Sequence, residues 1–306
     1  MATIAPQMQG TDVEDGAREV EAMIRYVDPG DLVTRRYVRA GDEINTGTYS
    51  DHRVTVRDGM PIRDHFTLDT HGFLIGRNPT AVSDFHDKAM VDRLYEREVE
   101  EDIRRRTGAD KVVARGWMIR TSADLTEHAN QKSENYQHTG GIQPPAGEAH
   151  VDLNTVTAQR MAANTYKKHF PDGPGYKRFL IASYWRTFSP PPQDVPLALC
   201  DGRTSFGGEE KSNTLFIVDE FPTGDALTAP VEGEDQMLAA SIFSHHPGHR
   251  WWYFSNMQKD DILLFKFHDS DHSRTWRCPH TAFADPSFPH ANIRESIEVR
   301  TVSFWE

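Results

Sequence analysis

Near the end of the chain stands the stretch Ile293-Arg294-Glu295-Ser296-Ile297-Glu298-Val299-Arg300-Thr301-Val302-Ser303-Phe304, which carries the signals of a β-strand. Side chains alternate between the two faces of a strand, so its even-numbered residues, Arg294 to Arg300, share one face. Upstream segments carry similar signals, and Pro- or Gly-containing turns separate many of them: Arg178–Phe188, Thr214–Asp219, Leu238–Ser244, Trp251–Ser255, Ile262–Phe267 and Arg274–Phe283. Seven or more short strands at such spacing favour a sandwich or barrel.

The first half of the chain adds helices to this β-rich part. Asp84 is the predicted N-cap of a helix that Thr107-Gly108 ends. The other expected elements are short strands within Val54–Phe73 (Val54–Arg57 and Phe66–Leu68), a strand at Val112–Ile119 and a helix at Thr155–Phe170. We therefore expect an α+β protein whose core is a double-stranded β-helix, or jelly roll, with N-terminal strands and helices packed on it.

Residues 1–306 are expected to form a single domain, with a loose, polar lead-in at 1–25. Residues 121–149 are polar, carry Gly140-Gly141 and Pro144-Pro145, and show little periodicity. So long a loop is uncommon in a compact domain unless it covers a site, so the segment is predicted to be an active-site lid; a surface insertion is the alternative.

The composition excludes several classes of partner. The net charge is −12 and no long basic block occurs, so no nucleic-acid partner is expected. The apolar runs are too short to span a bilayer, and residues 1–10 lack a signal-peptide pattern, so no membrane partner is expected. Cys200 and Cys278 are read as buried thiols in a reducing compartment, which makes the cytoplasm the expected location. Monomer and homodimer both stay open.

The tripeptide His150-Val151-Asp152 is the most informative motif. Residues two apart on a strand project to the same face, so the imidazole and the carboxylate converge. His280, on a predicted late strand, supplies a third ligand, and two histidines with one carboxylate leave the opposite face of a metal open, as in non-haem iron(II) oxygenases. Other histidines compete for the third position, namely His245, His246, His268, His272 and His290. The alternative without a metal is that His150 caps a strand and His280 is a core histidine.

Arg294-Glu295-Ser296 follows His280 and adds an anion-binding feature. The far carboxylate of 2-oxoglutarate needs a dry pocket, which a guanidinium fork and a hydroxyl two residues on, at Ser296, could form. Arg300 lies on the same face and competes with Arg294 for this role. An ion pair between Glu298 and Arg300 is the structural alternative, and we favour Arg294 as the anchor.

Further motifs, in order along residues 60–300, resemble one family. They are Phe66-Thr67-Leu68-Asp69, His71-Gly72-Phe73, Thr107-Gly108-Ala109, Ala149-His150-Val151-Asp152, Tyr184-Trp185-Arg186, Pro196-Leu197-Ala198-Leu199-Cys200-Asp201 and Pro279-His280-Thr281-Ala282-Phe283-Ala284-Asp285-Pro286. The chain is similar to the fungal and bacterial iron(II), 2-oxoglutarate-dependent oxygenases that include AsaB, the fungal gibberellin desaturase, CmcJ and the meroterpenoid endoperoxygenase NvfI. It departs at Ser183, where the family often has Asn before x-Trp-Arg.

The resemblance implies a dioxygenase that uses Fe(II), 2-oxoglutarate and O₂. His150, Asp152 and His280 would be the metal ligands, and Arg294 with Ser296 would bind the cosubstrate. The implied substrate is a hydrophobic natural product, such as a fungal terpenoid, meroterpenoid or polyketide, oxidised at an unactivated C–H by hydroxylation, desaturation or endoperoxide formation. A zinc hydrolase on the same ligands and a non-catalytic jelly-roll binding protein are the rival functions.

Overall fold

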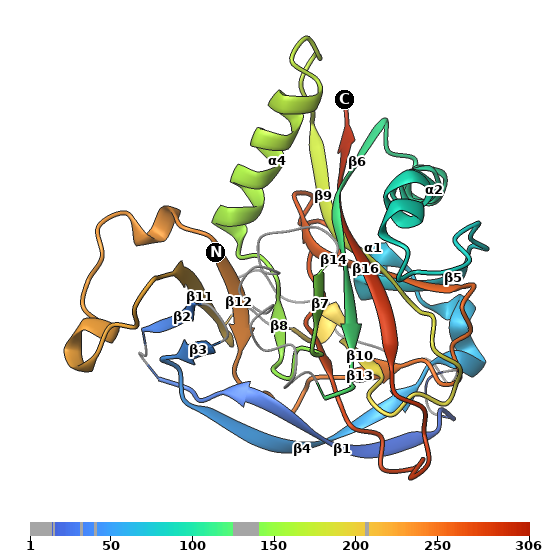
Figure 1. Cartoon of the computed structure of the whole chain (residues 1–306), viewed down its shortest axis with the longest axis horizontal. Helices are drawn as coiled ribbons and strands as arrows, with labels where there is room; N and C mark the ends of the chain where they lie inside the picture. The colour runs from blue at the N-terminus through green and yellow to red at the C-terminus, as the bar shows by residue number, and fades with distance from the viewer. Residues whose placement is uncertain (1–13, 15, 31–32, 40–41, 125–140, 206–207) are drawn as a thin grey trace.

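The computed structural model describes residues 14, 16–30, 33–39, 42–124, 141–205 and 208–306. Within these residues the chain forms two β-sheets that face each other, with helices on the outside and at one end (Figure 1). The two facing sheets confirm the α+β class with a jelly-roll core. None of the described helices is long and apolar enough to cross a membrane.

The larger sheet has ten strands among the described residues. In spatial order they are β1 (Glu19–Val27), β4 (Tyr49–Asp58), β13 (Trp251–Tyr253), β10 (Leu197–Cys200), β15 (His280–Ala282), β8 (His150–Val151), β12 (Ala239–Phe243), β11 (Glu210–Ile217), β2 (Thr34–Arg39) and β3 (Asp42–Asn45). Neighbours are antiparallel except for the pairs β13–β4 and β11–β2. The short β8 therefore lies at the middle of the sheet, between β15 and β12.

The smaller sheet has six strands in the described part of the chain. Their order is β5 (Phe73–Arg77), β14 (Asp261–Asp269), β9 (Arg178–Thr187), β16 (Glu295–Trp305), β6 (Lys111–Thr121) and β7 (Gly141–Gln143). The long strand β16 pairs with β9 on one side and β6 on the other. β7 runs parallel to β6 and ends the sheet.

Both faces of the six-stranded sheet are buried, and the alternation of side chains in β16 shows how. Ile297 and Val299 join an outer core beneath helix α2 (Lys88–Thr107), whereas Val302 and Phe304 join the core between the sheets. A strand with two buried faces is expected to be apolar almost throughout, which explains the continuous apolar run in β14. Ser296, Glu298 and Arg300 of β16 belong to the inward face.

The helices begin and end at capping residues. Asp87 caps α2, its side chain accepting a hydrogen bond from the backbone N–H of Met90, and Gly108 ends it in the left-handed conformation at φ 69°. Asn154 caps α4 (Thr155–His169), which begins shortly after β8. The remaining helices are short: α1 (Leu68–His71), η1 (Met60–His65), η3 (Gly202–Thr204), η4 (Gly224–Leu227) and η5 (Glu234–Gln236).

Four expectations about local structure were wrong. The lead-in predicted at 1–25 overlaps β1, which buries Val20, Ala22 and Ile24. Asp84 is not the N-cap of α2, because its side chain accepts instead from the N–H of His86 in a turn before the helix. Phe66–Leu68 is not a strand, since the Thr67 hydroxyl caps α1. Within Arg274–Phe283 only His280–Ala282 forms a strand.

Candidate metal centre

Strand register brings the predicted ligands together. His150 on β8 is the direct cross-strand partner of His280 on β15, so two residues far apart in sequence lie side by side. Asp152 follows β8 two residues after His150 and turns to the same side. Nε2 of His150 lies 3.2 Å and Nε2 of His280 lies 3.6 Å from Oδ1 of Asp152. The predicted convergence of these three side chains is therefore present, and their donor atoms lie within 4.8 Å of one another.

Hydrogen bonds at the two Nδ1 atoms determine which nitrogen of each ring faces the cluster. Nδ1 of His150 lies 2.7 Å from the carbonyl oxygen of Glu148, and Nδ1 of His280 lies 3.2 Å from that of Cys278. A carbonyl oxygen only accepts, so each Nδ1 carries a proton and donates it, and Nε2 is the nitrogen of each ring that faces Asp152. Two ring nitrogens and a carboxylate oxygen therefore converge in a buried space. A cation that takes the place of protons on the two Nε2 atoms would hold all three, so the donor set fits iron(II).

The charges around Asp152 favour its ionised form. Burial acts to raise the pKa of Asp152, but the guanidinium of Arg300 and the two imidazoles outweigh it and hold the pKa well below its usual range. Nη2 of Arg300 lies 2.6 Å from Oδ2 of Asp152, while Oδ1 faces the histidines. Arg300 also lies 3.6 Å from Glu298, so the ion pair considered from the sequence is present. The contact with Asp152 was not predicted.

Arg294 lies next to the histidines, at the start of β16. It lines a narrow cavity of about 20 Å³ together with His150 and His280, and its side chain is 1% exposed. Nη1 donates to the carbonyl oxygen of Val195 at 2.7 Å, and Nε has no hydrogen-bond partner in the described part of the chain. Burial lowers the pKa of Arg294 to about 9, and the positive charge of Arg120 contributes. Ser296 is buried and lines neither this cavity nor the larger one; its hydroxyl donates to the carbonyl of Arg120 at 3.4 Å.

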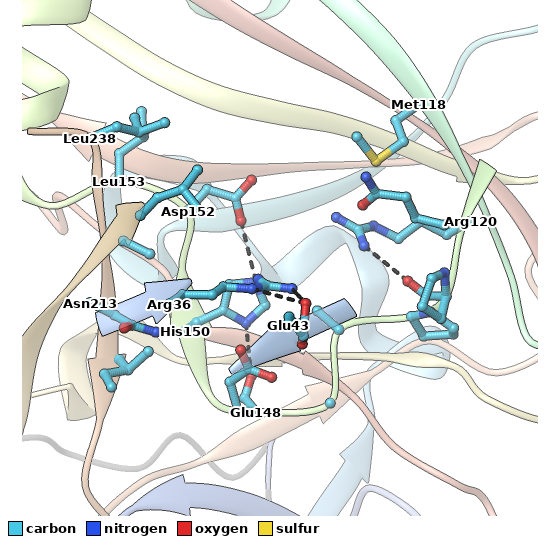
Figure 2. Close-up of a pocket in the computed structure, with 18 of the residues that line it drawn as sticks. Arg36, Glu43, Met118, Arg120, Glu148, His150, Asp152, Leu153, Asn213 and Leu238 are labelled. Atoms are coloured by element: carbon cyan, nitrogen blue, oxygen red, sulfur yellow. Dashed lines mark hydrogen bonds and ion pairs between the residues drawn. The ribbon is translucent and has the colours of Figure 1, made fainter. Parts of the chain in front are cut away.

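A larger cavity of about 420 Å³ opens on the other side of the ligands, between the two sheets (Figure 2). His150, Asp152 and Arg300 lie on its wall. Its apolar lining consists of Met118, Leu153, Met161, Leu215, Leu238 and Ile242. Pro144 to Glu148 also line it, so the described end of the predicted lid lies at the cavity, whereas residues 125–140 of that prediction fall outside the described residues. Arg120, Ala146 and His150 line both cavities and form their shared wall.

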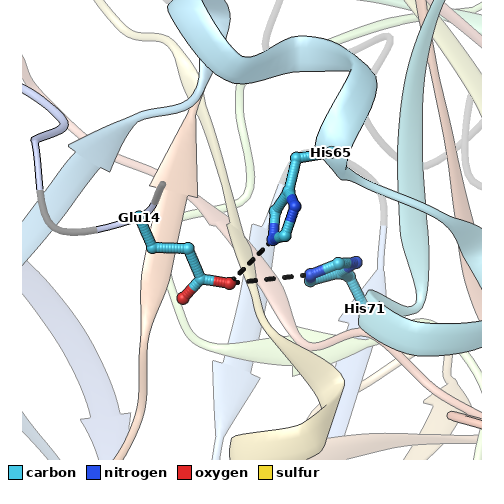
Figure 3. Close-up of side chains that lie close together, drawn as sticks. All are labelled: Glu14, His65 and His71. Carbon is cyan, nitrogen blue, oxygen red and sulfur yellow. Dashed lines mark hydrogen bonds and ion pairs between the residues drawn. The ribbon is translucent and has the colours of Figure 1, made fainter. Parts of the chain in front are cut away.

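A second cluster of two histidines and a carboxylate lies elsewhere in the fold, formed by Glu14, His65 and His71 (Figure 3). Oε1 of Glu14 lies 3.0 Å from Nε2 of His65 and 3.9 Å from Nε2 of His71. The carboxylate also pairs with Arg203 at 3.1 Å and Arg250 at 3.2 Å. The backbone N–H of Thr67 donates to Nδ1 of His71, so Nε2 of His71 carries the proton and offers no lone pair. We call this group the Glu14 clasp.

The competing histidines and other residues of the quoted motifs and segments lie away from the metal centre. The competing histidines, among them His268, lie outside the ligand cluster. Arg186 is buried on the α2 side, where it donates to Tyr95 and to the carbonyls of Lys259 and Asn78. Trp251 to Phe254 pack in the core between the sheets and line neither cavity. Sequence reasoning missed Arg120, Gln143 and Asn213, which line the large cavity and carry no motif.

Comparisons with known proteins identify the family of the chain. A family model described as an oxidoreductase/YMDC permease-like domain matches residues 24–304. The chain is 31% identical over 278 residues to a hydroxylase/desaturase of Cercospora beticola, covering 87% of this chain and 83% of the relative. It is 29% identical to the Fe(II)/2-oxoglutarate-dependent dioxygenase nvfI of Aspergillus novofumigatus, over 84% of both chains.

A solved structure supports the fold. The iron and alpha-ketoglutarate-dependent endoperoxidase NvfI superposes with a TM-score of 0.73 at 24% identity, covering 94% of this chain and 98% of the other. An alpha-ketoglutarate-dependent dioxygenase of Talaromyces stipitatus is 28% identical over 85% of this chain. The chain therefore belongs to this oxidoreductase family, and it is an Fe(II)- and 2-oxoglutarate-dependent dioxygenase.

Proposed function

We propose that His150, Asp152 and His280 hold the iron and that the large cavity holds an apolar secondary metabolite, which the enzyme oxidises at an unactivated C–H bond. The observation that carries the proposal is the convergence of two Nε2 atoms and Oδ1 of Asp152, with each Nδ1 bonded to a backbone carbonyl. Iron(II) bound there supplies oxidation of the substrate by O₂, coupled to conversion of 2-oxoglutarate to succinate and CO₂.

Arg294 is the proposed anchor for the far carboxylate of 2-oxoglutarate. An unpaired guanidinium nitrogen in a buried site is costly unless an anion joins it, and burial already lowers the pKa of Arg294 to about 9. The same narrow cavity contacts both histidines, so a dicarboxylate held by Arg294 would reach the metal. Arg300 also has an Nε atom without a partner in the described residues, but it lines only the large cavity and its Nη2 already pairs with Asp152. The hydroxyl of Ser296 is still predicted to assist Arg294 in binding the cosubstrate carboxylate.

The narrow cavity must widen to admit 2-oxoglutarate. At about 20 Å³ it has room for little more than a water molecule. Arg120 stands in the wall shared with the large cavity, where it donates to the carbonyl oxygen of Pro144 at 3.0 Å and to Glu298 at 3.2 and 3.4 Å. Rotation of the Arg120 side chain would join the two spaces, so Arg120 is proposed to move when the cosubstrate enters.

The cavity also supports an apolar substrate. Its volume of about 420 Å³ falls within the range of small-molecule sites, roughly 300–1,000 Å³. Its apolar side chains surround the ligand cluster on the cavity side, where they exclude water from a reacting C–H bond. Relatives are named hydroxylase/desaturase and dioxygenase, and the solved structure an endoperoxidase, so hydroxylation, desaturation and endoperoxide formation are the proposed outcomes.

The test is a screen of terpenoids, meroterpenoids and polyketides with iron(II), 2-oxoglutarate and O₂. Succinate formation should rise with a true substrate, and the product should gain one oxygen atom, lose two hydrogen atoms, or gain two oxygen atoms. N-oxalylglycine should inhibit competitively with 2-oxoglutarate. Substrate conversion that proceeds equally well without O₂ would instead support the zinc hydrolase.

A further inference from the structure

Two amide side chains on the wall of the large cavity are buried without a full set of partners. Asn213 on β11 is 4% exposed, and its Nδ2 donates to Oδ1 of Asn45 at 3.3 Å, while its own Oδ1 has no donor in the part of the chain that the structure describes. Gln143 on β7 is also 4% exposed, and its Nε2 has no acceptor among the described residues. Both residues line the cavity, and the unused atoms themselves are buried, so a rotation of each amide would bring an unused polar atom to a ligand.

The sheet register places Asn213 relative to the metal ligands. Asn213 is the cross-strand partner of Ala240, and the next residue, Ser241, pairs with Val151, so Ala240 stands level with Asp152. Asn213 therefore lies two strands from Asp152 on the same face, at roughly 10 Å, or two strand spacings. The small side chain of Ala240 leaves the space between them open to a ligand. All three residues line the cavity.

Gln143 comes from the opposite sheet. It pairs with Arg120 across the parallel ladder of β7 and β6, whereas Asn213 belongs to the ten-stranded sheet. The two amides thus stand on opposite walls, with Met118, Leu215 and Ile242 among the apolar side chains of the same cavity. The wall of the cavity therefore carries one unused acceptor and one unused donor, in addition to its apolar and its charged side chains.

The four arginines that line the cavity are already paired. Arg25 pairs with Asp51, Arg36 with Glu43, Arg120 with Glu298 and Arg300 with Asp152. A substrate carboxylate would have to break one of these ion pairs, whereas neutral polar groups can use the amides without doing so. An unsatisfied buried amide is costly, so a ligand that supplies its missing partner is favoured over one that does not.

We propose that Asn213 and Gln143 select a neutral substrate that is already oxygenated. Its apolar skeleton presents a hydroxyl that donates to Oδ1 of Asn213 and a carbonyl that accepts from Nε2 of Gln143. This inference rests on the proposed function, because it takes the large cavity as the substrate site. It also implies that a reaction which installs oxygen on the carbon skeleton precedes this enzyme.

The experiment is affinity selection with mass spectrometry on the anaerobic iron(II)–2-oxoglutarate complex. The probes are matched fused-ring terpenoid and steroid sets in four forms: unsubstituted, hydroxyl only, ketone only, and hydroxyl plus ketone. The wild type should retain the doubly substituted members best. Asn213→Leu should lose only the preference for the hydroxyl and Gln143→Met only the preference for the ketone, each by roughly tenfold.

The control is Gln193→Met. Gln193 is a buried amide that donates to the carbonyls of Ser189 and Met257 and lines neither cavity, so its loss should leave selectivity unchanged. A general loss of folding would weaken all probes equally, and thermal unfolding of each variant measures it. Equal retention of all four forms by the wild type would overturn the inference. Retention of no probe, by protein that still binds iron and 2-oxoglutarate, would overturn both the inference and the apolar substrate site, leaving the dioxygenase assignment intact.

Discussion

The chain contains two clusters of two histidines and one carboxylate, and they differ in the hydrogen bonds behind the rings. At the metal centre, both Nδ1 atoms donate to backbone carbonyls, so the Nε2 atoms of His150 and His280, which can bind a metal, face Oδ1 of Asp152. In the Glu14 clasp, a backbone N–H donates to Nδ1 of His71, so its Nε2 atom carries a proton toward Glu14, at 3.9 Å. The first arrangement can offer both rings to a cation, whereas in the second the His71 proton occupies the nitrogen that faces the carboxylate.

The arginines that pair with the two carboxylates also differ. Two arginines pair with Glu14, which leaves no negative charge for a metal ion, and the cluster joins residue 14 to η1, α1 and η3. At the metal centre one arginine contacts Oδ2 of Asp152 and leaves Oδ1 toward the histidines. Proximity of ligand-type residues is therefore insufficient, and the hydrogen bonds of the outer nitrogens decide which cluster can bind metal.

The largest expected effect separates the two clusters directly. His150→Ala, Asp152→Ala and His280→Ala should each abolish turnover and iron binding, because each removes one of three converging ligands. His71→Gln in the clasp should retain both. Iron content after anaerobic loading and succinate formation are the measurements, with thermal unfolding as the check on folding. Substantial activity in His280→Ala, with another histidine at the metal, would show that the third ligand is misassigned.

The next effect compares the two arginines on the inward face of β16. Arg294→Lys keeps the charge but loses the guanidinium fork, so the KM for 2-oxoglutarate should rise roughly ten- to a hundredfold, equivalent to about 1.5–3 kcal/mol. Arg300→Lys should leave that KM nearly unchanged, because Arg300 pairs with Asp152 and Glu298 and lies outside the narrow cavity. Steady-state kinetics on both variants measure this. The reverse pattern would make Arg300 the anchor.

A smaller effect tests the clasp as a structural element. Glu14→Gln removes the charge from a side chain that is 6% exposed and pairs with Arg203 and Arg250. The free energy of unfolding should fall by about 1.5–3 kcal/mol, the range for hydrogen bonds to charged groups. Iron affinity should stay at the wild-type value. Chemical denaturation and iron titration are the measurements, and a loss of iron binding with unchanged stability would instead make the clasp a metal site.

The smallest effect is a change in pH dependence. Burial lowers the pKa of His71 from 6.5 to about 4, so between these values the unfolded chain binds a proton that the folded chain does not. Stability should therefore fall as pH falls through this window. His71→Gln should make the slope shallower by up to about 1.4 kcal/mol per pH unit. Denaturation between pH 5 and 6.5 avoids titration of Glu14, whose pKa is lowered from 4.5. An unchanged slope would mean that His71 does not titrate in this way.

The sequence predicted those features that depend on local pattern. Runs of strand-type residues, many of them separated by Pro- or Gly-containing turns, located β9, β14 and β16, and the spacing of His150 and Asp152 placed both on one face. Features that depend on long-range register could not be read locally. The pairing of His150 with His280 arises from neighbouring strands, and the contact of Arg300 with Asp152 joins the two facing sheets. The approach of Asn213 to the cavity likewise depends on the register of the larger sheet.

Two features that the sequence analysis assigned wrongly or missed have physical explanations. Asp84 and Asp87 both stand before α2 and both can cap a helix, so propensity alone did not distinguish them, and the turn at His86 decided it. The Glu14 clasp was not predicted, because Glu14 lies in a segment without periodicity and meets its histidines only in the folded chain.

Anaerobic titration with iron(II) and then 2-oxoglutarate tests the central claim most directly, because the chelate absorbs weakly in the visible region. The wild type and His71→Gln should both develop the band with one iron per chain, and His150→Ala, Asp152→Ala and His280→Ala should develop none. A band that persists in these three variants, or that disappears in His71→Gln, would contradict the assignment of the iron to His150, Asp152 and His280.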